Sequence, residues 1–116
     1  MNKIIIEAND SWQESLDIVR IGEVNKGGAY TKYVIQNTQA EEEYAAITFQ
    51  DGNPHEQING ASNEALLTIV LDRMRSWNQG EFKCRENALA ITKLEEVLHW
   101  LDHRTNRIQR IGEGTH

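Results

Sequence analysis

Two amphipathic segments occupy residues 63–108, which read NEALLTIVLDRMRSWNQGEFKCRENALAITKLEEVLHWLDHRTNRI. In the first segment, apolar side chains recur every three or four residues, which is the spacing of one helix face. These side chains are Leu66, Leu67, Val70, Leu71, Met74 and Trp77. The pattern predicts a helix over about Asn63 to Asn78, with Ser62 or Asn63 as its N-cap and Gly80 as its stop signal.

The second segment begins near Cys84 and predicts a longer helix of about 25 residues. One face of this helix, which we call the seam, is expected to pack on the first helix. Its residues recur at alternating four- and three-residue steps: Asn87, Ile91, Leu94, Leu98, Leu101, Thr105 and Ile108. Because residues 79–83 form only a short link, the two helices must pack antiparallel as an αα-hairpin. Further apolar residues widen the second helix beyond this seam, namely Ala88, Ala90, Val97 and Trp100. We therefore expect this helix to pack against more than its hairpin partner, most simply against another copy of the chain.

Upstream of the hairpin the pattern changes from helical to strand-like. Four segments rich in β-branched or aromatic residues are separated by polar or Gly-rich breaks, which predicts four short antiparallel strands. The segments are Lys3–Glu7, Leu16–Glu23, Tyr30–Gln36 and Tyr44–Phe49. Gly27 and Gly28 offer the positive φ of a hairpin turn between the second and third segments. A helix over Ser11 to Val19 is an alternative, because its apolar residues also recur at helical spacing.

The predicted fold class is α+β. A small antiparallel sheet of about four strands occupies residues 1–50. A connector follows at residues 51–61, which are rich in Gly, Asn and Gln and contain the only proline, Pro54. The helical hairpin and a C-terminal tail occupy residues 62–116, as one compact unit.

The composition is typical of a soluble protein of one domain. The chain has 116 residues, of which 39% are hydrophobic and 26% charged. No apolar run approaches the ~18 residues of a membrane span. Met1 to Glu7 carries one lysine and a short isoleucine run, unlike a signal peptide. The single cysteine, Cys84, excludes an internal disulfide and fits a reducing compartment, so we expect a cytoplasmic protein.

Charge is distributed unevenly along the chain. The net charge of −6 disfavours general binding to duplex nucleic acid. Residues 1–60 carry four basic and ten acidic residues, whereas residues 61–116 carry eight of each. Arg104, Arg107 and Arg110 lie close together near the C-terminus. They could hold a small anion locally on a protein that repels polyanions as a whole.

Catalytic and metal-binding signatures are weak. His99 and His103 are four residues apart, with Asp102 nearby, which is a spacing that lets two imidazoles share a zinc ion. However, no Glu follows His99 as in the HExxH motif and no thiolate pair exists, so exposed histidines without a metal are favoured. Cys84 has no adjacent base and is expected to be a buried structural thiol. No catalytic residue, metal or cofactor is therefore assigned.

The segment from Trp77 onward carries groups suited to holding a nucleotide. Trp77 offers a π-face for a base, Asn87 offers an amide for the base edge, and the three arginines offer planar forks for phosphates. In an antiparallel hairpin Trp77 and Asn87 are neighbours, whereas Arg104 lies ~25 Å further along the second helix. One chain cannot bring these groups together, but antiparallel helices across a symmetric interface can.

The same residues also have purely structural interpretations. Trp77 would cap the hairpin, Asn87 would bond within a helix turn, and the arginines would form a solvated turn that favours the helix dipole. The chain would then be a helical module for protein binding or transcription regulation. A DNA reader needs a continuous basic helix face. Here basic and acidic residues alternate: Arg73, Arg75, Lys83 and Arg85 with Asp72, Glu81 and Glu86.

Short motifs from Phe49 to the C-terminus carry a family resemblance. They are Phe49-Gln50-x-Gly52, Glu56, Asn59-Gly60, Asn63-Glu64-Ala65-Leu66-Leu67, Asp72-Arg73, Gly80, Cys84-Arg85-Glu86-Asn87-Ala88, Arg104-Thr105 and Gly112-Glu113-Gly114-Thr115-His116. Together they resemble the phage signal-sponge proteins, which comprise the anti-Thoeris sponges and their shorter anti-CBASS relatives. The Cys-Arg-Glu-Asn and terminal Gly-Thr-His elements are the most specific. The strand region agrees in general character with the longer anti-Thoeris branch.

This resemblance implies a non-enzymatic protein that binds and sequesters a nucleotide immune messenger. In the anti-Thoeris branch the messenger is a cyclic ADP-ribose isomer, and some relatives also hold cyclic di- or trinucleotides in separate pockets. The resemblance implies a dimer-based homo-oligomer, a hexamer, with no cofactor. The place of action would be the cytoplasm of the infected bacterial host cell.

The resemblance also assigns ligand-binding residues by matching positions. The aromatic residue on which relatives stack a base corresponds to Trp77. The asparagine of their second helix corresponds to Asn87, and their C-terminal arginine corresponds to Arg104, which Thr105 follows. Arg107 and Arg110 lie where the spacing among relatives varies and are kept as candidates. The terminal Glu113, Gly114 and Thr115 are expected beside a ligand at a subunit contact.

Overall fold

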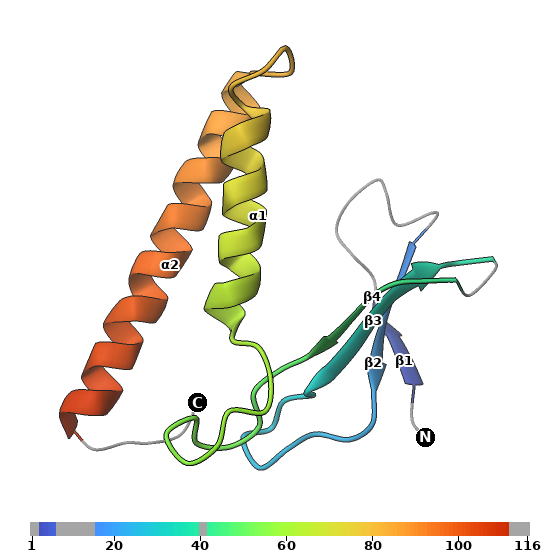
Figure 1. Cartoon of the computed structure of the whole chain (residues 1–116), viewed down its shortest axis with the longest axis vertical. Helices are drawn as coiled ribbons and strands as arrows, with labels where there is room; N and C mark the ends of the chain where they lie inside the picture. The colour runs from blue at the N-terminus through green and yellow to red at the C-terminus, as the bar shows by residue number, and fades with distance from the viewer. Residues whose placement is uncertain (1–2, 7–15, 40–41, 112–116) are drawn as a thin grey trace. The chain divides into compact units, whose positions relative to one another are not determined.

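The computed structural model describes residues 3–6, 16–39 and 42–111. Within them, strands precede helices in the chain (Figure 1): β1 Lys3–Ile6, β2 Leu16–Ile21, β3 Lys32–Asn37, β4 Glu43–Thr48, α1 Asn63–Trp77 and α2 Arg85–Ile111. This order confirms the predicted α+β class. The chain divides after Ala61 into two compact units, the sheet unit and the hairpin unit, and each is described by itself.

The strands form one antiparallel sheet in the order β1-β2-β3-β4, so each strand pairs with its neighbour in the chain. The predicted strands are confirmed, with ends shifted by one or two residues. Leu16 to Val19 belong to β2 and pair with β3, which excludes the alternative helix for these residues. The remainder of that alternative, residues 11–15, lies outside the described residues.

The connection between β2 and β3 contains a tight turn at Asn25 to Ala29. Gly28 has a φ of 85°, a conformation that residues with a side chain rarely adopt, as the Gly27-Gly28 pair predicted. The Asn25 Oδ1 accepts hydrogen bonds from the backbone N–H groups of Gly27 at 2.9 Å and Ala29 at 3.2 Å. The turn is therefore fixed by an asparagine side chain as well as by the glycine.

The buried centre of the sheet lies on β2 and β3. Val19 and Val34 are cross-strand partners and are 3% and 8% exposed. Tyr33 precedes Val34 and so points to the opposite face, where its ring meets Phe49 edge-on with centroids 5.5 Å apart. Both faces of the sheet thus carry apolar or aromatic side chains.

The segment between β4 and α1, which was predicted as a connector, forms a hydrogen-bonded loop. Gln50 Oε1 accepts from the backbone N–H of Asn59 at 3.0 Å. The Asn59 side chain bonds the backbone N–H and the carbonyl of Asp51, each at 2.8 Å. At Gly60 a Cβ would lie 2.4 Å from the carbonyl carbon of Phe49, so only glycine fits there. The loop therefore has a defined shape of its own.

Helix α1 begins and ends with polar caps. The Ser62 hydroxyl accepts a hydrogen bond from the backbone N–H of Ala65 at 3.0 Å, which confirms the predicted N-cap. At the other end Asn78 is the cap residue, and its N–H donates to the carbonyl of Met74 at 2.9 Å. The predicted bounds of about Asn63 to Asn78 are confirmed to within one residue, and Gly80 lies two residues beyond the cap, where its N–H donates to the carbonyl of Trp77 at 3.3 Å.

Helices α1 and α2 pack side by side and antiparallel (Figure 1), which confirms the αα-hairpin. The seven predicted seam residues of α2 are half-buried or buried, and every other described side chain of α2 is exposed. Ile108, at the end of this series, is 2% exposed, and Leu71 of α1 is 4% exposed. The helical spacing in the sequence therefore located the seam of α2 residue by residue.

Candidate ligand-binding site on the helical hairpin

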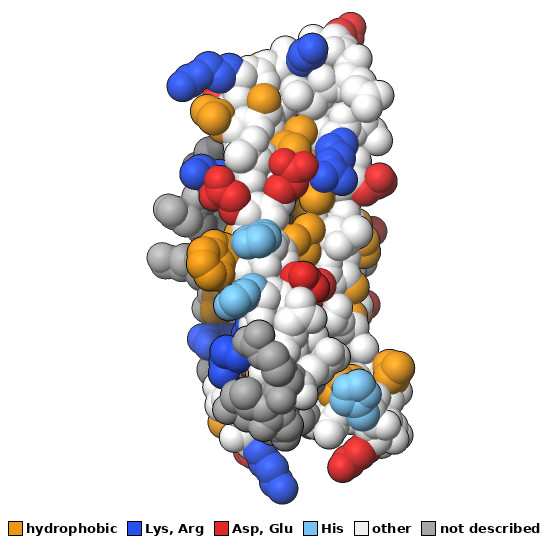
Figure 2. All heavy atoms as spheres, turned by 90° about the vertical axis from the view of Figure 1, so that its left-hand side faces the viewer, with side chains coloured by type: hydrophobic (Ala, Val, Ile, Leu, Met, Phe, Trp, Pro, Cys, Tyr) orange, Lys and Arg blue, Asp and Glu red, His pale blue; other side chains and the backbone are white. Residues whose placement is uncertain are grey.

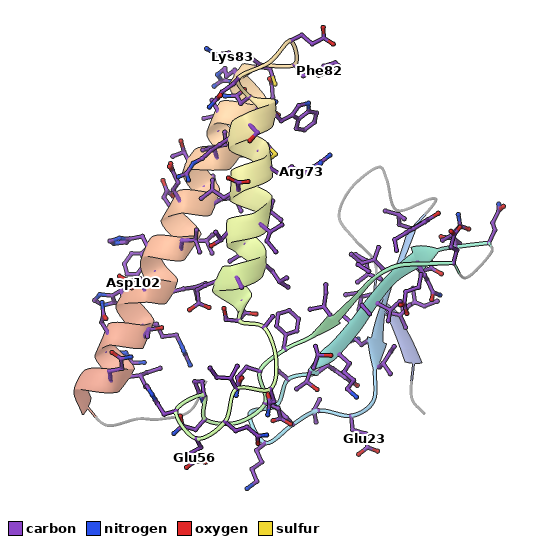
Figure 3. The ribbon with its side chains drawn as sticks, in the orientation of Figure 1. Glu23, Glu56, Arg73, Phe82, Lys83 and Asp102 are labelled. Carbon is purple, nitrogen blue, oxygen red and sulfur yellow. The ribbon has the colours of Figure 1, made fainter. Side chains whose placement is uncertain are left out.

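The link between α1 and α2 presents two aromatic side chains to solvent. Trp77 is the last residue of α1 and is 48% exposed, and Phe82 in the link is 61% exposed. Their ring centroids are 6.4 Å apart and their planes are inclined by 54°. Figure 3 shows Phe82 and Lys83 at the end of the hairpin where the helices are joined. The stacking surface predicted at Trp77 is therefore bordered by a second ring.

Asparagine side chains from both ends of the link hold its backbone in place. Asn87, half-buried in the first turn of α2, donates from Nδ2 to the carbonyl oxygen of Phe82 at 3.1 Å. Asn78 accepts at Oδ1 a hydrogen bond from the backbone N–H of Cys84 at 3.1 Å. Trp77 and Asn87 are thus brought to the same end of the hairpin, as predicted, and Phe82 is held beside them.

The other titratable candidates are exposed. Cys84 is exposed, so the predicted burial of its thiol is wrong: it lies in the link, before the buried seam of α2 begins. His99 and His103 are also exposed, and their rings meet Trp100 edge-on with centroids 5.8 and 5.9 Å apart. Within the described ranges, no three His, Cys, Asp or Glu side chains are grouped to hold a metal ion.

The arginine candidates lie towards the other end of α2. Arg104 and Arg107 are exposed, and Thr105 between them is half-buried in the seam. Because α2 is one continuous helix from Arg85 to Ile111, Arg104 lies about 25 Å from Asn87 along its axis. The structure therefore places the stacking and phosphate-binding candidates at opposite ends of one hairpin, and a single chain does not bring them together.

The remaining predicted residues lie at or beyond the end of α2. Arg110 belongs to its last turn, and the side chain of Arg110 is outside the described part of the chain. Glu113, Gly114 and Thr115 lie outside the described residues altogether.

Both helices also expose large apolar side chains outside the seam. They are Ile69, Val70 and Trp77 of α1 and Leu89, Val97 and Trp100 of α2, which are between 43% and 66% exposed. Figure 2 shows hydrophobic side chains reaching the surface among acidic and basic ones on the side that it views. Where such apolar groups adjoin one another on a helix surface, they are typical of a protein contact. Of the helices in the described ranges, neither is long and apolar enough to span a membrane.

An ion pair that joins the two helices adds an acidic side chain to the basic surface considered above. Arg75 Nη2 of α1 lies 2.7 Å from Glu95 Oε2 of α2, with both side chains about half exposed. Arg75 is one of the four basic residues that a DNA-reading face would use, and its charge is already partnered. The pairing therefore weakens the DNA-binding interpretation.

Comparisons with known proteins place these features in a family. Residues 41–105 match the model of the family described as "Acb2/Tad1, hairpin domain", which covers more than half of the chain. The chain is also similar to "Thoeris anti-defense 1" of Bacillus phage SBSphiJ7, with 44% identity over 93 residues, 78% of this chain and 64% of that protein. The match thus spans just under two thirds of that protein's length. Trp77, Asn87 and Arg104 all lie within the matched family region. The chain therefore belongs to the Acb2/Tad1 hairpin family.

Proposed function

We propose that this protein binds a nucleotide immune messenger and sequesters it without cleaving it, thereby blocking a bacterial anti-phage defence. The messenger class is a cyclic ADP-ribose isomer, by resemblance to the anti-Thoeris sponges. The protein acts in the cytoplasm of the infected host cell. The observation that carries the proposal is the exposed ring of Trp77 at the end of the hairpin where the helices are joined, which is also the end that carries Asn87.

The proposed site combines stacking with charge. A nucleobase stacks on Trp77 and contributes ~1–3 kcal/mol. Arg104 makes charge-assisted hydrogen bonds to the pyrophosphate, each contributing roughly 1.5–3 kcal/mol. A nanomolar dissociation constant corresponds to about −12 kcal/mol, so these contributions reach it only in a preorganised pocket. The further proposed contacts are Asn87, Thr105, Arg107, Arg110 and the terminal Glu113, Gly114 and Thr115.

Sequestration of this kind depends on the assembly of several chains. Because Trp77 and Arg104 lie at opposite ends of one hairpin, the ligand binds where antiparallel hairpins of two subunits meet. The exposed apolar residues of α1 and α2 provide surface for such contacts. We propose a dimer-based homo-oligomer, a hexamer by family resemblance, with cyclic oligonucleotides as further ligands in separate pockets.

A calorimetric titration tests the proposal. The purified protein is titrated with a cyclic ADP-ribose isomer and, separately, with a cyclic trinucleotide. It is then denatured by heat, and the ligand is recovered and analysed. We expect tight binding and recovery of the intact ligand. Recovery of cleaved product would indicate an enzyme instead, and the absence of heat with both ligands would favour a helical protein-binding module.

A further inference from the structure

We propose that Phe82 forms a second aromatic wall of the nucleobase site and that Asn87 acts as a positioning residue that holds Phe82 beside Trp77. This inference rests on the proposed function and adds a residue to its site. Neither the spacing of apolar residues nor the family motifs singled out Phe82. Phe82 is identified instead by the geometry of the link.

The first observation is the exposure of Phe82. A phenyl ring that stabilises the fold is normally removed from water, yet Phe82 is 61% exposed and its aromatic contact is with Trp77, which is itself 48% exposed. The centroid distance of 6.4 Å lies within the range of interacting aromatic pairs. Two adjoining exposed rings therefore form one apolar surface that remains open to a ligand.

The second observation is that the link backbone is fixed where Phe82 stands. The Asn87 amide bonds the Phe82 carbonyl, and the Asn78 amide oxygen bonds the N–H of Cys84 two residues later. Within the link, the N–H of Lys83 also donates to the carbonyl of Gly80 at 3.2 Å. A ring on a fixed backbone loses less conformational entropy on binding than a ring on a mobile loop.

The ring geometry restricts what this surface can bind. Rings inclined by 54° with centroids 6.4 Å apart leave no room for a base sandwiched between them. They fit a planar base that stacks on the indole and meets the phenyl ring at its edge. Lys83 follows Phe82 at the same end of the hairpin (Figure 3). The shape of the ring surface therefore suits a planar base that stacks on one ring.

The role of Asn87 follows from its hydrogen bond. An amide has two N–H groups and one oxygen, and one N–H of Asn87 is used by the Phe82 carbonyl. Loss of this bond would release the backbone that carries Phe82. Part of the effect of an Asn87 substitution on ligand affinity should therefore be exerted through Phe82.

The first test compares two substitutions of Phe82 in calorimetric titrations of the full chain with a cyclic ADP-ribose isomer. Phe82→Leu keeps an apolar side chain but removes the ring, and we expect five- to tenfold weaker binding. Phe82→Tyr restores the ring, and we expect affinity within twofold of the wild type. Val24→Ala is the matched control, since Val24 is an apolar side chain that is 53% exposed in the connection between β2 and β3, outside the hairpin, and we expect no change. Unchanged melting temperatures would show that all variants fold.

The second test is a double-mutant cycle with Asn87→Leu, a near-isosteric change that removes the amide without adding charge. We expect Phe82→Leu to weaken binding by less than twofold in the Asn87→Leu background, compared with five- to tenfold in the wild type. Equal factors in the two backgrounds would overturn the positioning role of Asn87. Wild-type affinity in Phe82→Leu would overturn the role of Phe82 while leaving the proposed function intact. Failure of the wild-type protein to bind would overturn both.

Discussion

The two ends of α2 differ in the side chains that they expose. At the link, two aromatic rings are exposed on a backbone held by asparagine side chains, whereas at the far end the exposed side chains include arginines of the regular helix. Aromatic rings bind a ligand only at contact distance, and their binding depends on the shape of that ligand. Guanidinium groups act over longer range, through flexible side chains, and are screened by salt. The two ends of one helix therefore offer different kinds of recognition, and a ligand that uses both must meet two chains.

The first test disrupts the packing of α1 against α2, which holds the two ends of the hairpin in place. Leu71 is 4% exposed within the hairpin, and Leu71→Ala should lower the free energy of unfolding by about 3 kcal/mol because it leaves a cavity. Urea unfolding followed by circular dichroism, at a fixed protein concentration, measures the change. Ser76→Ala, at an exposed polar position of the same helix, should cost less than about 0.5 kcal/mol. Equal losses in the two variants would show that α1 is not packed as described.

Combining changes at both ends tests whether they belong to one site. Trp77→Ala together with Arg104→Ala should weaken messenger binding on the order of a hundredfold, if the loss of stacking on the base and the loss of the charge at the pyrophosphate each cost about tenfold. Mixing the two single variants, after dissociation and reassembly, should restore roughly a quarter of the sites in random dimers, because some interfaces then receive both native residues. Calorimetry gives the number of sites. The absence of restored tight sites would refute a site shared between subunits.

The single variants sharpen the contrast between stacking and charge. Trp77→Ala and Arg104→Ala should each weaken binding at least about tenfold while the oligomer, measured by light scattering, stays intact. Titrations at low and high salt separate them: Trp77→Ala keeps the salt dependence of the wild type, whereas Arg104→Ala loses part of it. Unchanged affinity in both variants would remove these residues from the site.

The smallest expected effect concerns the ion pair that joins the helices. Arg75→Gln removes the bond to Glu95, but both side chains are about half exposed, so we expect a loss of only about 0.5 kcal/mol in unfolding free energy. Messenger affinity should not change, because the pair lies outside the two ends. A tenfold loss of affinity in this variant would extend the binding surface to the middle of the hairpin.

Helical spacing predicted the hairpin well because burial in a two-helix pair follows the repeat of the helix itself. The seam residues of α2 are half-buried or buried as predicted, and those from Asn87 to Leu98 lie in the part of α2 that the 15-residue α1 can cover. The width of the buried face was harder to predict. Val70 and Trp77 share the apolar spacing of α1 but are 47% and 48% exposed, because one partner helix covers only a narrow stripe.

The candidate site was predicted in part. The family motifs supplied Trp77, Asn87 and Arg104, and the length of α2 explained why they are separated in one chain. Phe82 was missed because its position depends on the conformation of the link and on the hydrogen bond from Asn87, which periodicity does not encode. The feature of the sequence that could have identified Phe82 is its position as a large aromatic residue between Glu81 and Lys83, in an otherwise polar link. The burial of Cys84 was predicted wrongly for the same reason, because helical periodicity carries no information about the conformation of the link.

The exposed thiol at the link has a practical consequence. Cys84 is the only cysteine of the chain and lies two residues from Phe82, so a thiol-reactive fluorophore can be attached at one defined point beside the aromatic rings. A dye placed there would change its emission when a nucleotide covers the rings. The protein could thus be converted into an optical biosensor that reports the concentration of a messenger in infected cell extracts as it rises and falls.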